Sequence, residues 1–69
     1  MILSRQEELD KLEKAIDKLK PEYKEVIVLA KIDGLSHKEI GERLGKHPHA
    51  VCVLLYRALT ALTEAYEDT

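Results

Sequence analysis

The placement of glycine and proline is the feature that most constrains the fold of this chain. Three glycines and two prolines occur among its 69 residues, and most stand at the edges of apolar, periodic segments. Pro21 and Pro48 suit the first position of a helix, where a missing N–H costs no hydrogen bond. Gly34 and Gly45 suit the left-handed residue that follows a helix. These positions predict helices throughout, with no repeat and no linker long enough to separate two domains.

Residues 4–19 are expected to form a surface helix with one narrow apolar stripe. Ser4 and Glu7 have the spacing of a capping box at its start. The stripe follows at helical spacing and consists of Leu9, Leu12, Ile16 and Leu19. Most other positions are Lys, Asp or Glu, which favours a solvated outer face over a dedicated binding patch.

The segment that begins at Pro21 is expected to be the buried, central helix, because its apolar residues occupy several sides. One face holds Tyr23, Val26, Ile27 and Ala30, and the other sides hold Val28, Leu29 and Ile32. Since the chain has no Trp or Phe, we expect an aliphatic core. Tyr23 is the expected core tyrosine and Tyr56 is expected to be exposed.

Two further helices complete the prediction. Ser36 and Glu39 have capping-box spacing and open a short helix that Gly45 ends. Gly41 lies inside that helix, where it costs about 1 kcal/mol relative to Ala, and we interpret it as a close helix–helix crossing. The last helix has His47 at its N-cap and extends to about residue 66. Its core face is Val51, Leu54, Leu55, Ala58 and Leu62, and its opposite side is His49, Cys52, Val53, Tyr56, Arg57 and Thr60.

The stretch from residue 37 to 57 has the pattern of a helix-turn-helix. Small residues stand at Gly41 and Gly45, and aliphatic anchors stand at Ile40, Leu44, Val51 and Leu54. We therefore expect an all-α, four-helix (tetrahelical) helix-turn-helix DNA-binding domain. Its last helix would enter a major groove about 12 Å wide. Phosphates would lie at the two helix N-termini, near residues 36–38 and 47–49.

Composition limits the remaining possibilities. A net charge of −2 excludes nucleic-acid binding by bulk charge, although residues 37–57 carry four basic residues against two acidic ones. One cysteine provides no disulfide framework and fits a reducing cytosol. No apolar run approaches the roughly 20 residues of a membrane span, and the start lacks a secretory signal pattern. We expect a cytoplasmic, nucleoid-associated protein without membrane contact.

The run LKPEYKEVIVLAKIDGLSHKEIGERLG, followed by the turn and VLLYRALTAL, resembles a known family. It is similar to the C-terminal promoter-binding domain, region 4, of bacterial sigma factors, and most similar to the extracytoplasmic-function (ECF) group. The resemblance covers about residues 15–62. It implies that residues 1–69 are one such domain, expected to be a fragment of a longer sigma factor. It also implies binding to the −35 promoter element and to the β-subunit flap of RNA polymerase, with an anti-sigma factor as a further possible partner.

The resemblance also implies which residues contact DNA. His37 and Lys38 would approach the backbone, and the recognition helix would contact bases and phosphates through His49, Ala50, Cys52, Val53, Tyr56 and Arg57. We include three further residues in the predicted DNA-binding set. Arg43 and Lys46 are basic residues beside the turn, and His47 is expected to be an N-cap or a phosphate contact. Cys52 and Leu54 stand where the family commonly has basic residues. Either the promoter sequence differs, or the isolated domain binds DNA weakly.

Other interpretations remain open at this level. A response-regulator domain of the LuxR type shares the tetrahelical shape, and it would dimerise, whereas we expect a monomer. A third hypothesis is a module that acts mainly through protein contacts with RNA polymerase or an anti-sigma factor. The spacing of His47, His49 and Cys52 does not match a standard structural zinc site. No catalytic set is present, so we expect neither an enzyme nor a cofactor.

Overall fold

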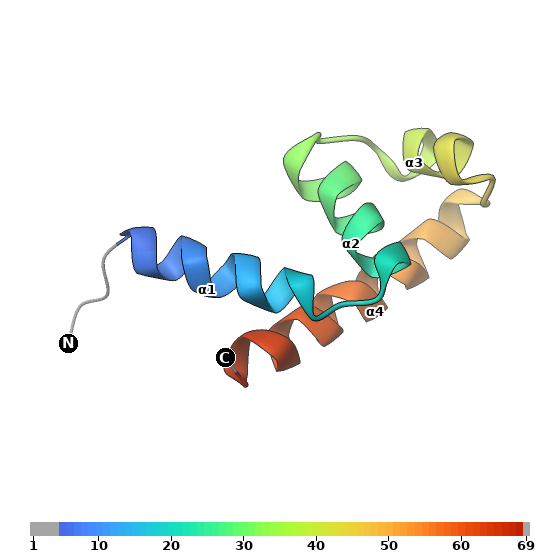
Figure 1. Cartoon of the computed structure of the whole chain (residues 1–69). Coiled ribbons are helices and arrows are strands. Elements are labelled where there is room, and N and C mark those ends of the chain that lie inside the picture. Colours follow the sequence, from blue (N-terminus) through green and yellow to red (C-terminus); the bar gives the residue numbers. More distant parts are fainter. Residues whose placement is uncertain (1–4, 69) are drawn as a thin grey trace.

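The structure of the protein, a computed structural model, describes residues 5–68. These residues form α1 (Arg5–Asp17), α2 (Pro21–Ile27), the short π-helix η1 (Val28–Ile32), α3 (His37–Leu44) and α4 (Pro48–Glu67) (Figure 1). The described residues contain no strand, which confirms the all-α prediction with four α-helices. The expected cap at Ser4 lies outside the described residues.

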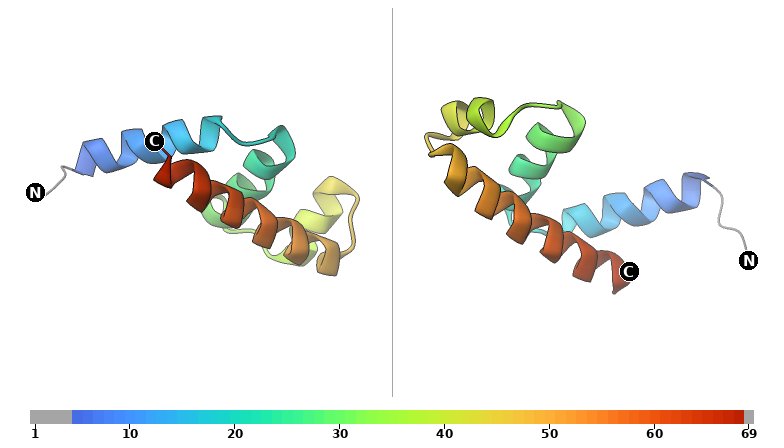
Figure 2. Two further views of the ribbon diagram at one scale, coloured as in Figure 1. Left: turned by 90° about the horizontal axis from the view of Figure 1, so that it is seen from below. Right: turned by 180° about the vertical axis from the view of Figure 1, so that it is seen from behind.

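The long helix α4 is the element around which the others are arranged. It contacts α1, α2 and α3. In the ribbon views α3 lies near the N-terminal end of α4, whereas α1 lies beside its C-terminal half (Figure 2). The molecule is accordingly elongated, with extents of 43 × 19 × 16 Å. The start of α4 therefore lies far from α1, at the end of the molecule formed by α3 and the turn.

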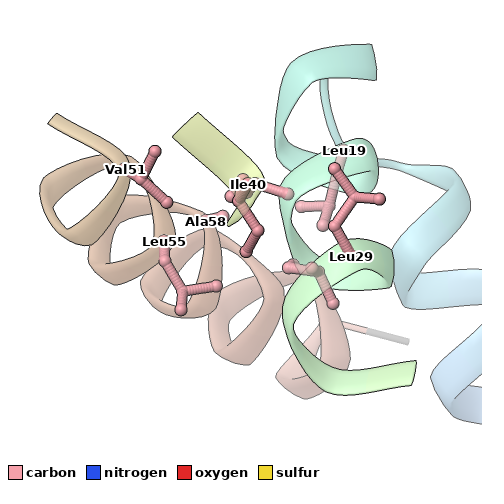
Figure 3. Packing of buried hydrophobic residues seen from close by; sticks show 8 residues of the cluster. Leu19, Leu29, Ile40, Val51, Leu55 and Ala58 are labelled. Carbon is pink, nitrogen blue, oxygen red and sulfur yellow. The ribbon is translucent and has the colours of Figure 1, made fainter. Parts of the chain in front are cut away.

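The hydrophobic core is aliphatic, as predicted, and joins α2, η1, α3 and α4 (Figure 3). Ile40, Val26 and Val51 are the largest side chains that are fully buried. Tyr23 packs against this core as the sequence indicates. The predicted core face of α4 is also confirmed, since Val51, Leu55 and Ala58 are buried and Leu54 and Leu62 pack against them. This core holds α3 and α4 together.

The predicted apolar stripe of the first helix is wrong for two of its residues. Leu9 and Leu12 are exposed, whereas Ala15, which is not part of the predicted stripe, is fully buried. The reason is geometric. The main packing partner of α1 is α4, where Lys11 Nζ lies 4.5 Å from the ring centroid of Tyr66. The small Ala15 side chain allows the helices to approach, whereas Leu9 and Leu12 line an open depression beside Tyr66 and remain exposed there.

The central helix also differs from the prediction. Val26, Ile27 and Leu29 are buried, but Val28 is exposed and Ile32 is 70% exposed. The chain widens into the π-helix η1, where the Asp33 N–H donates to the Val28 carbonyl oxygen at 2.9 Å. The predicted face of Tyr23, Val26, Ile27 and Ala30 is confirmed, since all four belong to the core or pack against it, and the exposed Val28 and Ile32 are the residues for which burial on several sides is wrong. Gly34 then adopts a φ of 70°, which confirms its predicted left-handed conformation.

Candidate nucleic-acid interface

The start of α3 is fixed by a capping box between Ser36 and Glu39. The Glu39 N–H donates to Ser36 Oγ at 3.1 Å, and the Ser36 N–H donates to Glu39 Oε1 at 3.0 Å. The hydrogen bond from the Ser36 backbone N–H to the Glu39 carboxylate is the main reason why the pKa of Glu39 lies below its ordinary value of 4.5, and the Ser36 hydroxyl and the charge of Arg43 act in the same direction. The predicted cap is confirmed, and it sets where α3 begins.

The turn between α3 and α4 is held by backbone hydrogen bonds and by a close approach at Gly41. Gly45 has a φ of 67°, and the N–H of Lys46 donates to the Gly41 carbonyl oxygen at 2.8 Å. A Cβ at position 41 would collide with the carbonyl oxygen of Lys46 and lie 3.6 Å from the nitrogen of Pro48. Gly41 thus marks a close approach, as predicted, although the turn backbone causes it and not the facing helix.

The start of α4 is capped by a histidine. His47 has extended backbone angles, and its Nδ1 accepts a hydrogen bond from the His49 N–H at 3.1 Å. Pro48 occupies the first turn, as predicted. An imidazole nitrogen that accepts a hydrogen bond carries no proton, so in the neutral ring the proton is on Nε2. His47 can therefore cap α4 through Nδ1 and still donate a hydrogen bond outward through Nε2.

An open depression lies over this turn, and we call it the turn depression. It is lined by Lys38, Gly41, Glu42, Gly45, Lys46, His47 and Pro48. It brings together Lys38, Lys46 and His47 from the predicted set, whereas His37 and Arg43 are exposed on α3 and do not line it. Glu42 is a lining residue that the sequence interpretation did not select. Its carboxylate reduces the positive potential there, and its spacing from Lys38 and Lys46 along the chain could have identified it.

The exposed side of α4, here called the outer face, comprises His49, Ala50, Cys52, Val53, Tyr56, Arg57 and Thr60. These residues lie opposite the buried Val51, Leu55 and Ala58, so the predicted division of the helix is confirmed. Tyr56 is 74% exposed, and Cys52 is an exposed free thiol. Every residue in the predicted DNA-binding set is exposed.

The charges on the turn and on the first part of α4 favour the binding of an anion. Between residues 43 and 63 the sequence contains no Asp or Glu, and it contains Arg43, Lys46 and Arg57. Arg57 is the only Lys or Arg between residues 48 and 60. Within residues 5–68, no cluster of His, Cys, Asp and Glu side chains could hold a metal ion. An anion at this surface would meet the N-terminus of α4, a few basic side chains and an outer face of low polarity.

The short helix α3 is joined by a tight turn to the longer helix α4, which exposes one face from its first residue onward, and this arrangement defines a helix-turn-helix domain. The family model described as Sigma-70, region 4 matches residues 9–62. The chain belongs to this family. Comparisons with curated proteins and with solved structures gave no match.

Membership of this family gives the domain a general function. Sigma-70 region 4 is a DNA-binding domain of transcription initiation, not a catalytic one, and membership supports binding to the −35 promoter element by a sigma factor. It also implies interaction with RNA polymerase. No helix among residues 5–68 is both long enough and apolar enough to cross a membrane.

Proposed function

We propose that this chain is the region 4 domain of an ECF sigma factor and that α4 enters the major groove of a −35 promoter element. The observation that carries the proposal is the outer face of α4, which is exposed from the capped start of the helix to Thr60. The turn depression lies next to the start of this face. A recognition helix contacts base edges through its N-terminal residues, and the preceding helix crosses the DNA backbone. The ECF assignment rests on the sequence resemblance.

Separate parts of this surface have separate roles in the proposal. His37, Lys38, Arg43 and Lys46 contact phosphates, and His47 donates to a phosphate oxygen through Nε2 while Nδ1 keeps its cap bond. The outer face of α4 contacts bases through His49, Ala50, Cys52 and Val53, with Tyr56 and Arg57 at its far end. Phosphate contacts set the position of the domain on the duplex, and base contacts set its sequence preference.

The proposal includes partners and location. The domain acts as a monomer in the cytoplasm, at the nucleoid, and docks on the β-subunit flap of RNA polymerase. An anti-sigma factor is a further partner.

A test begins with selection of bound sequences from a randomised duplex library, using the full chain. The affinity of the enriched duplex is then measured by fluorescence anisotropy at several salt concentrations. Affinity should fall steeply with salt, because each neutralised phosphate contributes about −0.9 to the slope of log K against log salt. Arg57→Ala should weaken binding about tenfold, since hydrogen bonds to charged groups contribute roughly 1.5–3 kcal/mol.

Arg5→Ala is the matched control, because Arg5 is an exposed arginine at the start of α1, the helix that lies beside the C-terminal half of α4 (Figure 2). It should leave the affinity unchanged within twofold. Failure to enrich any sequence, or equal losses in the two variants, would contradict the proposed interface.

A second candidate function is a module that acts mainly by protein contacts. The neutral run of Cys52, Val53 and Leu54, together with the exposed Ile32, favours it. It predicts a complex with core RNA polymerase in a pull-down experiment while the chain enriches no duplex. The family match favours both of these functions over a LuxR-type response regulator.

A further inference from the structure

The outer face of α4 has few groups that form hydrogen bonds to bases. Between residues 48 and 60 the sequence contains no Asn, Gln, Lys, Asp or Glu. These are the side chains that, with Arg, make the common bidentate and charged contacts to base edges in the major groove. Arg57, His49 and the exposed Tyr56 hydroxyl are the donors that remain, because the Thr60 hydroxyl donates to the Tyr56 carbonyl oxygen. Few polar contacts to bases are therefore open to this face, and its apolar residues offer a second kind of contact.

Val53 lies at the middle of the outer face. Successive residues of an α-helix are rotated by about 100°, so residues two apart point in nearly opposite directions. Val51 and Leu55, each two residues from Val53, are both buried, which directs Val53 away from the core. Val53 is 37% exposed. Ala50, one turn before it, is exposed on the same side of the helix.

The size of this apolar group indicates what it could contact. Protein interfaces need about 800 Å² from each partner, and one valine with one alanine supplies only a few methyl groups. His49, Tyr56 and Arg57 surround them, which makes the patch small and polar at its edges. In the major groove, the apolar feature of comparable size is the C5-methyl group of thymine.

The spacing also fits neighbouring base pairs. Residues three apart in a helix are separated by about 4.5 Å along its axis. Successive base pairs of a duplex are separated by about 3.4 Å. Two apolar side chains at this spacing can therefore contact methyl groups on adjacent base pairs, or on two base pairs with one other pair between them.

We propose that Val53 and Ala50 determine sequence preference by contacting thymine methyl groups in the major groove. This inference rests on the proposed function, since it requires α4 to enter the groove. The bound element then contains thymine at one or two fixed positions that no arginine of the chain reads.

Deoxyuridine substitution tests this directly, because deoxyuridine pairs like thymine and lacks only the methyl group. The probe is the duplex that the full chain enriches from a randomised library, with each thymine replaced singly by deoxyuridine. Anisotropy titrations should show a loss of about fourfold in affinity at one or two positions, the factor expected when one methyl-sized group is no longer buried. Other thymines should be replaceable without effect.

Variants connect this loss to Val53. Val53→Ala should remove the difference between thymine and deoxyuridine at one position, while Val53→Thr, which keeps one methyl group, should retain part of it. Val28→Ala is the matched control, since Val28 is 36% exposed but lies on η1. It should keep the full difference. Circular dichroism spectra of the three variants should match that of the parent chain.

The outcomes separate the inference from the proposed function. An enriched duplex that binds in a salt-dependent manner but loses no affinity with deoxyuridine overturns the inference and leaves the proposed function standing. A deoxyuridine effect that survives Val53→Ala at every position also overturns the role of Val53. If no duplex is enriched and the chain binds core RNA polymerase, both the inference and the proposed DNA interface fail.

Discussion

Replacing Gly41 with alanine should destabilise the protein, although the same change at a solvent-exposed position inside a helix would stabilise it. Alanine is favoured over glycine inside a helix by about 1 kcal/mol. At position 41 the added Cβ would collide with the carbonyl oxygen of Lys46 and lie 3.5 Å from the carbonyl carbon. That carbonyl belongs to the turn backbone, which cannot rotate away as a side chain could. The backbone shift that relieves such a clash lowers the free energy of unfolding by about 1–3 kcal/mol.

The clash should outweigh the helix preference, because the turn is tied to Gly41 itself. The Lys46 N–H donates to the Gly41 carbonyl oxygen at 2.8 Å, so moving Lys46 away also weakens this bond. We expect Gly41→Ala to lower the free energy of unfolding by about 2 kcal/mol. For a domain of this size that corresponds to a fall in Tm of roughly 10 °C.

Thermal unfolding followed by circular dichroism measures the change. Glu42→Ala is the control, because Glu42 is the next residue of α3 and is exposed. Its Tm should lie within about 3 °C of the parent value, since surface substitutions are usually within 0.5 kcal/mol. A Tm for Gly41→Ala equal to or above that of the parent chain would refute the argument from the close approach.

Three further predictions follow from packing and capping. Ile40→Ala should lower the free energy of unfolding by about 2–5 kcal/mol in urea titrations, whereas Ile32→Ala should change it by less than about 0.5 kcal/mol, because only Ile40 is buried. The pKa of Glu39 is lowered in the folded state, so its stabilising effect is present above pH 4.5 and is lost as pH falls through the folded value. Between pH 6 and pH 3 the Tm should therefore fall less for Glu39→Gln than for the parent chain. His47→Asn should keep the cap of α4, whereas His47→Ala should lose about 1 kcal/mol of stability in urea titrations.

The sequence predicted local devices well because each depends on neighbouring residues. The Ser36–Glu39 capping box, the left-handed Gly34 and Gly45, and the His47 cap all lie where the pattern places them. Apolar spacing also predicted the two sides of α4, since the periodicity of a long regular helix is uninterrupted.

What the sequence could not predict depends on contacts between distant segments. Leu9 remains exposed in an open depression beside Tyr66, and no local pattern specifies how far α1 and α4 overlap. The sequence also contained no sign of the π-helix η1, because a single widened turn has no clear sequence signature, and it did not show that Val28 and Ile32 would lie outside the core. Glu42 entered the turn depression because the fold brings the α3 surface beside the turn.

The residues that place the proposed interface are mostly not the residues that would contact DNA. Gly41 allows the turn to approach α3, and its carbonyl oxygen accepts hydrogen bonds from both Gly45 and Lys46. Lys46 is thereby held at the edge of the turn depression, one residue before the His47 cap that fixes the start of α4. A shift of this turn would move Lys46 and the outer face together. Gly41→Ala should therefore also weaken duplex binding, even at temperatures where the variant is folded, and Glu42→Ala should not weaken it.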